Sequence, residues 1–200
     1  MPTTTSPEKR LLQHPVALFV HLVLLGIVLL FGGLVVAYLS GMQTPGWEDF
    51  RLPRSFWLSS LMVVIISWYL RKTIAAFEME SGKLLVQRLL AASFFSLVFI
   101  ISQWTGWKDL QAQGITLADT PAAGYVYVIS GLHALHVGVG IVLLVVAIRR
   151  AWKYVADPAT ALFFFTDNNR KMRLRLLAHY WHTIDYLWLF LFLAFLYRHA

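Results

Sequence analysis

Five long apolar runs separated by short charged segments dominate this sequence of 200 residues. A helix needs about 20 apolar residues to cross a bilayer, whereas barrel strands alternate polar and apolar residues over roughly ten positions. The sequence therefore predicts an all-α membrane protein, a bundle of five transmembrane helices. The predicted spans are at about 16–40, 55–77, 84–104, 122–148 and 176–197. Residues 1–15 are expected to form a polar cytoplasmic head, and residues 16–200 the five-helix transmembrane domain.

Composition excludes several other classes of protein. Charged residues make up only 14% of the chain, against about 25% in a typical soluble domain. The absence of cysteine excludes disulfides, thiolate metal sites and cysteine nucleophiles. No P-loop, dinucleotide-binding, serine-hydrolase or zinc-protease motif occurs. The longest predicted connection, the loop 151–175, is too short for a catalytic domain, so the chain is expected to act through its bundle or through a partner.

The distribution of basic residues predicts the orientation, because Lys and Arg favour cytoplasmic loops. Most of the 17 basic residues lie in the N-terminal head and in the connections after the second and fourth spans. The other side holds only Arg51, Arg54, Lys108 and Arg198. We therefore expect the N-terminus in the cytoplasm and the C-terminus outside. The net charge of +7 then reflects topology and attraction to anionic lipid, and no nucleic-acid partner is expected.

Two groups of ionisable residues fall inside the predicted spans. His133 and His136 share one face of the fourth span, and His179, His182 and Asp185 follow one stripe of the fifth, since residues three apart lie on the same side of a helix. Such groups are costly in a membrane and mark sites of interest. Hydrogen bonding between helices, ligation of haem or a metal, and proton relay are the open alternatives.

The predicted depth of the two histidine pairs argues against a shared haem or metal. The fourth span runs inward, which places its pair in the outer half of the membrane, while the fifth span begins inside with its pair at the inner edge. A membrane cytochrome b instead pairs histidines on facing helices. We therefore expect the histidines to make hydrogen bonds between helices. Asp185 is expected to be a structural carboxylate bonded to a His or Trp on a neighbouring helix.

Both groups lie in motifs that resemble a known family. The segment Tyr180-Trp-His182-Thr-Ile-Asp185-Tyr-Leu-Trp-Leu-Phe is similar to the Tyr-Trp-His-Phe-Val-Asp-x-x-Trp-Leu-Phe pattern in the last helix of subunit III of haem-copper oxidases. Gly131-Leu-His133-Ala-Leu-His136-Val resembles Gly-Phe-His-Gly-Leu-His-Val in the penultimate helix. Residues 31–39 resemble the first helix of the short, five-helix bacterial form. The resemblance to the cytochrome c oxidase subunit III family covers nearly the whole chain.

This resemblance implies a non-catalytic subunit III of a bacterial haem-copper terminal oxidase, which couples oxygen reduction to proton pumping in aerobic respiration. It implies no catalytic residue, no metal site and no cofactor on this chain; haem and copper are expected in the partner catalytic subunit, subunit I. The chain would stabilise subunit I alongside other oxidase subunits, organise bound phospholipid and support proton uptake in the bacterial inner (cell) membrane. The implied lipid-binding or structural polar residues are His133, His136, Arg149, His182 and Asp185.

Two alternatives stay open, a haem-b membrane cytochrome and the accessory subunit of a nitric oxide reductase. The chain also departs from the family pattern at two places. Many members carry a buried glutamate in the first helix of the short form and another in a Gln-x-x-Glu-Tyr motif of the third, where this chain has Ile27 and Gly106. Roles that need those carboxylates are therefore not expected, whereas a structural and lipid-organising role is.

Overall fold

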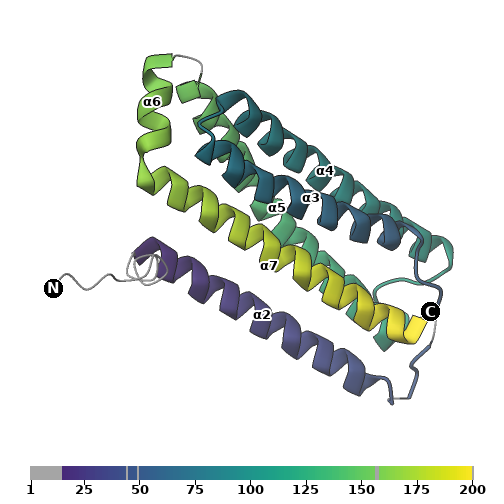
Figure 1. Cartoon of the computed structure of the whole chain (residues 1–200). Coiled ribbons are helices and arrows are strands. Elements are labelled where there is room, and N and C mark those ends of the chain that lie inside the picture. The colour runs from purple at the N-terminus through teal and green to yellow at the C-terminus, as the bar shows by residue number, and fades with distance from the viewer. Residues whose placement is uncertain (1–14, 44, 49, 156–157, 200) are drawn as a thin grey trace.

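The computed structural model describes residues 15–43, 45–48, 50–155 and 158–199, and all the regular elements in these ranges are helices. Five long helices lie side by side and alternate in direction, and one short helix crosses an end of the bundle (Figure 1). Their bounds are α2 Pro15–Gly41, α3 Ser55–Glu78, α4 Gly82–Ala112, α5 Pro121–Val155, α6 Pro158–Thr166 and α7 Asn168–His199. The predicted all-helical bundle is confirmed for this part of the chain.

Each predicted span lies within one long helix. Among the described residues, α2, α3, α4 and α5 are long and apolar enough to cross a membrane. The last helix, α7, is not in this group; it begins with a basic segment and carries the polar stripe through His182 and Asp185. The five-span count and the orientation of the two termini therefore stay predictions.

The segment 151–175 differs most from its prediction as a loop. The fourth span continues as helix to Val155, α6 follows, and α7 begins at Asn168. Proline is favoured at the first position of a helix because it lacks an N–H there, and Pro158 begins α6. Asp167 then starts α7 by accepting a hydrogen bond at Oδ1 from the Asn169 backbone N–H at 2.8 Å. Asp157 and most of the polar head, residues 1–14, lie outside the described residues.

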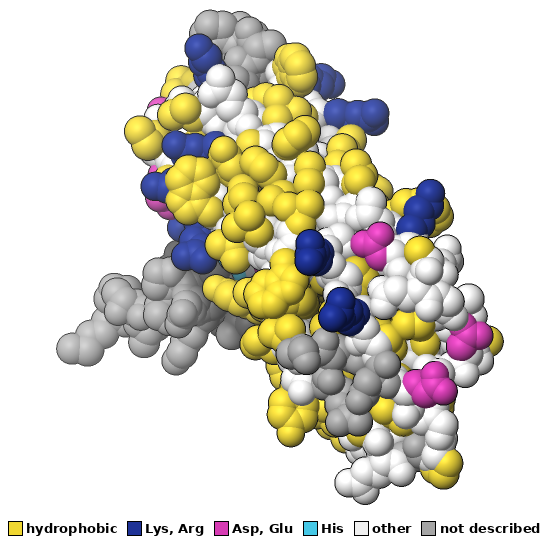
Figure 2. Space-filling model, turned by 90° about the vertical axis from the view of Figure 1, so that its right-hand side faces the viewer, with side chains coloured by type: hydrophobic (Ala, Val, Ile, Leu, Met, Phe, Trp, Pro, Cys, Tyr) yellow, Lys and Arg dark blue, Asp and Glu magenta, His cyan; other side chains and the backbone are white. Residues whose placement is uncertain are grey.

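The helices pack around an antiparallel α3–α4 pair. Both α5 and α7 contact this pair, whereas α2 packs chiefly on α5 and α7 at the edge of the bundle (Figure 1). Aromatic side chains fill the centre, where Phe31, Phe99 and Trp188 are fully buried. Large apolar side chains also cover the outside, in a broad hydrophobic band (Figure 2). Soluble monomers rarely expose apolar patches of that extent, so the outer surface fits lipid.

Close approach of helices depends on glycine at two places. At Gly140 a Cβ would lie 2.7 Å from Cζ2 of Trp181, so glycine lets the indole of α7 lie directly on α5. At Gly106 a Cβ would lie 2.5 Å from Cε1 of Phe56 and 2.8 Å from the Ser55 hydroxyl. The volume that a glutamate would need at position 106 is therefore filled by α3 in this structure.

Candidate functional site

A buried polar cluster joins α3 to α7. Ser67 of α3 donates its hydroxyl to Oδ2 of Asp185 at 2.6 Å, and the hydroxyl oxygen of Ser67 also lies 2.9 Å from Nδ1 of His182. His182 and Asp185 are three residues apart, so they meet Ser67 on one face of α7. A hydroxyl has one proton, and when Ser67 gives it to Asp185 the serine oxygen must accept from Nδ1–H of His182. The cluster thus selects one histidine tautomer.

This Ser–His–Asp cluster lacks the arrangement of a hydrolase triad. In a triad the carboxylate orients the histidine, and the histidine activates the serine. Here the carboxylate of Asp185 accepts from Ser67 itself. The arrangement satisfies a carboxyl group that is only 3% exposed and ties two helices together. The neighbour that bonds Asp185 is a serine, where the sequence led us to expect a histidine or a tryptophan.

His133 of α5, which belongs to the motif of the penultimate helix, lies at the centre of the bundle. Its ring is fully buried, with centroids 5.2 Å from Trp188, 5.6 Å from Phe99 and 6.1 Å from Phe31. Neither ring nitrogen has a hydrogen-bond partner among the described residues. The expected hydrogen bond between helices is therefore replaced, over this part of the chain, by aromatic contacts with α2, α4 and α7.

His136 links α5 to α7 through its backbone. Its Nδ1 lies 2.8 Å from the Leu132 carbonyl oxygen of its own helix, and its own carbonyl accepts a hydrogen bond from the Tyr180 hydroxyl at 2.8 Å. Because Gly140, one turn further along α5, packs on Trp181, the two histidine motifs lie closer in depth than predicted. Even so, no group of three or more metal-ligating side chains occurs among the described residues.

Further polar contacts hold the remaining helices together. Nε2 of Gln103 on α4 donates to the Ser59 hydroxyl of α3 at 2.7 Å, and Ser59 also pairs with Ser102 at 2.6 Å. On α2, the ring of His21 lies 5.0 Å from that of His179. The sequence gives no signal for the serines, which look like ordinary small residues of an apolar helix.

A cleft of about 510 Å³ opens between α2, α5, α6 and α7. Apolar side chains such as Val20 and Leu143 line most of it, and Arg150, Arg170 and Arg173 add positive charge to its wall. The guanidinium of Arg170 lies 4.1 Å above the Tyr154 ring and pairs with Asp167 at 3.0 Å. The sequence had pointed to Arg149 as a headgroup contact, but its neighbour Arg150 is the one that lines the cleft.

Comparison with known proteins agrees with the motifs. A model of the family "Cytochrome c oxidase subunit III" matches residues 56–200. The chain is 22% identical to cytochrome c oxidase subunit 3 of Corynebacterium diphtheriae, over 84% of this chain and 80% of the relative. It is 22% identical to the probable cytochrome c oxidase subunit 3 of Mycobacterium tuberculosis, over 82% of this chain and 79% of the relative.

Animal relatives are longer. The chain is 25% identical to cytochrome c oxidase subunit 3 of Pisaster ochraceus over 66% of its own residues, but this match spans only 44% of the relative. The chain thus spans less than half the length of the animal relatives that it matches. The family match nevertheless includes α3 to α7 with both histidine motifs, and on this basis the chain belongs to the cytochrome c oxidase subunit III family.

Proposed function

We propose that this chain is the non-catalytic subunit III of a bacterial haem-copper terminal oxidase, the complex that reduces oxygen and pumps protons. The observation that carries the proposal is the family match over residues 56–200, together with the use of its motif residues as contacts between helices. His133, His182 and Asp185 serve packing and hydrogen bonding. A chain built in this way stabilises a neighbouring catalytic subunit and supports proton uptake by keeping that subunit intact.

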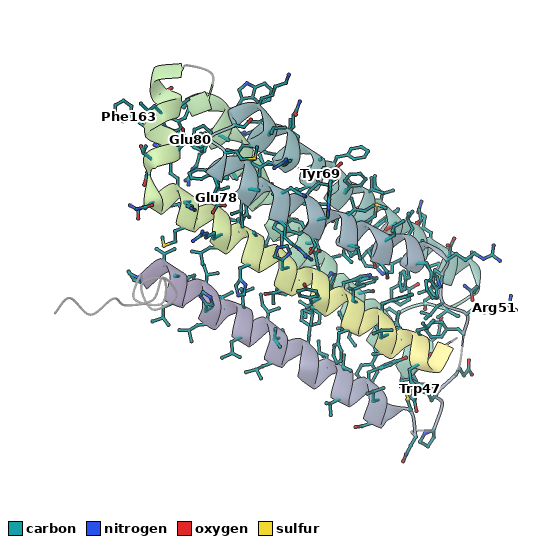
Figure 3. The ribbon with its side chains drawn as sticks, in the orientation of Figure 1. Trp47, Arg51, Tyr69, Glu78, Glu80 and Phe163 are labelled. Atoms are coloured by element: carbon teal, nitrogen blue, oxygen red, sulfur yellow. The ribbon has the colours of Figure 1, made fainter. Side chains whose placement is uncertain are left out.

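The proposed topology has five spans in a bacterial inner membrane, with α7 as the fifth. It is supported by the alignment of α7 with the other long helices (Figure 1) and by exposed apolar side chains on it, such as Phe190 and Leu193. Lys171 and Arg175 lie at the end that is proposed to be cytoplasmic, where both contact Glu78, at 3.1 and 3.3 Å. Arg51 lies at the opposite end of the bundle (Figure 3).

The proposed ligand of this chain is phospholipid, and its proposed protein partner is subunit I, which holds the haem and copper. Acyl chains fit the apolar wall of the cleft at Val20 and Leu143, and a phosphate group fits beside Arg150 and Arg173. Cationic side chains at the end of a membrane helix attract anionic headgroups. Arg149, on the same turn of α5, stays a proposed headgroup contact outside the cleft.

Purification of the tagged full-length chain in mild detergent tests this proposal. A reduced-minus-oxidised spectrum and mass spectrometry would be recorded on the purified material, and the spectrum repeated on the chain after it is separated from its partners. We expect haem to arrive with a large catalytic subunit of the oxidase type and to be absent from the separated chain of 22.8 kDa. Haem retained by the lone chain would support the alternative of a haem-b membrane cytochrome. Co-purification with the catalytic subunit of a nitric oxide reductase would support the alternative of an accessory subunit of that enzyme.

A further inference from the structure

The short helix α6 is fixed to the end of the bundle by aromatic contacts on its inner side. Phe164 is buried, and its ring lies 5.7 Å from Phe77 of α3 and 6.0 Å from Tyr154 of α5. Phe165 also contacts Phe77, at 5.3 Å. Because these contacts reach two long helices, α6 has a defined position across the end of the bundle, steeply inclined to α5 and α7 (Figure 1).

The outer side of α6 presents large apolar side chains that nothing in the described chain covers. Leu162 is 60% exposed and Phe163 is 74% exposed, and Phe163 points away from the bundle (Figure 3). Trp152, at the end of α5, is 62% exposed. The surface that these few side chains expose is far smaller than the roughly 800 Å² that each partner contributes to a stable protein interface. A lipid surface needs no such area, because single side chains insert into it.

The charges around α6 match such a surface. Lys153 precedes α6, and Arg170 and Arg173 follow it near the start of α7. Arg170 stacks on both Tyr154 and Phe164, at 4.1 and 4.8 Å, so a cation is held directly beside the aromatic residues of α6. Helices that lie in the plane of a membrane combine Phe, Trp and Leu on one face with Lys and Arg at the rim.

We propose that α6 is an in-plane membrane anchor, in which Leu162 and Phe163 insert at the boundary between headgroups and acyl chains and Lys153 and Arg173 bind anionic phospholipid. The anchored leaflet is the one that meets the junctions of α3 with α4 and of α5 with α7. The segment 151–175 then positions the end of the bundle on the bilayer as well as connecting two spans. This inference does not depend on the identity of the oxidase.

The absence of cysteine from the sequence makes a direct test of depth practical. A nitroxide would be attached to Phe163→Cys in the full-length chain, reconstituted in vesicles of phosphatidylcholine and phosphatidylglycerol. Its collision rates with oxygen, which concentrates in lipid, and with a water-soluble nickel chelate would be compared. Lys83→Cys, an exposed polar site at the same end of the bundle, is the aqueous control, and Leu193→Cys, an exposed apolar site on α7, is the lipid control.

We expect the ratio of oxygen to nickel collisions at position 163 to exceed that at position 83 several-fold and to approach that at position 193. The ratio should fall when phosphatidylglycerol is left out, or when Lys153 and Arg173 are both changed to Gln. A ratio at position 163 equal to that at position 83 would place α6 in water and overturn the proposal. Suppression of both collision rates would mean that protein covers α6, which overturns it as well. A ratio that is indifferent to the anionic lipid would refute the electrostatic part.

Discussion

Replacing Ser67 with Ala tests whether the cluster at Asp185 holds α3 and α7 together. The substitution removes the hydroxyl oxygen of Ser67. The carboxyl group of Asp185, which is only 3% exposed, then loses the hydrogen bond of 2.6 Å that now satisfies it. The substitution also removes the partner of His182 at 2.9 Å. Hydrogen bonds between membrane helices are worth about 0.6 kcal/mol on average and about 1.7 kcal/mol at most, and a buried polar group left unsatisfied costs about 1–3 kcal/mol.

The expected loss for Ser67→Ala is therefore about 2 kcal/mol, which is a change of about 30-fold in the unfolding equilibrium. The free energy of unfolding would be measured by titrating the purified full-length chain from mild detergent into SDS and following helix content. Ser96→Ala is the matched control, because Ser96 is buried as Ser67 is, but among the described residues its hydroxyl bonds to the Ala92 carbonyl of its own helix and to no other helix. This control should lose much less stability, because a serine hydroxyl bonded to the i−4 carbonyl of its own helix contributes little to stability. Equal losses for the two variants would refute the interhelical role of Ser67.

Three further experiments test the packing and lipid proposals. Asp185→Asn should reduce the yield of assembled complex more than the turnover of each complex that forms, because the carboxyl is a packing group; normal yield with collapsed proton pumping would contradict this. Arg150→Gln combined with Arg173→Gln should lower the phospholipid phosphorus that co-purifies with the complex, and unchanged phosphorus would count against the cleft as a lipid site. Gly106→Ala should destabilise the chain by about 1–3 kcal/mol through overpacking against Phe56. Gly138→Ala, where a Cβ meets nothing within 4 Å, should be neutral or slightly stabilising in the same SDS titration.

Much of the fold could be predicted because charge-free runs of membrane length leave few alternatives. Each predicted span lies inside a helix, and the stripes of His133 and Asp185 were visible from residue type and spacing alone. The helix α6 could not be predicted in this way, because nine residues with three consecutive phenylalanines show no helical periodicity. Its helical form depends on Pro158 at its start and on the aromatic contacts of Phe164 and Phe165 with the ends of other helices.

The contacts of the polar residues were less accessible to sequence reasoning. Ser67 gains its role only because Asp185 lies opposite it, and nothing in the sequence of α3 says which helix packs there. Arg149 and Arg150 differ by about 100° around the axis of α5, since a helix has 3.6 residues per turn. Which of the two lines a cleft depends on the placement of α2 and α7, which follows from tertiary packing.

The attachment of α2 at the edge of the bundle constrains how the protein is made. As the most N-terminal of the described helices, α2 leaves the ribosome before the others, yet it packs chiefly on α5 and α7, the two long helices that are made last. The pair α3–α4, which shares the largest interface, is complete much earlier. Helices that are stable alone in lipid associate in a second step, and α2 carries no charged residue over Pro15–Gly41. The first of the described helices must therefore stay without its main packing partners until α5 and α7 have been made.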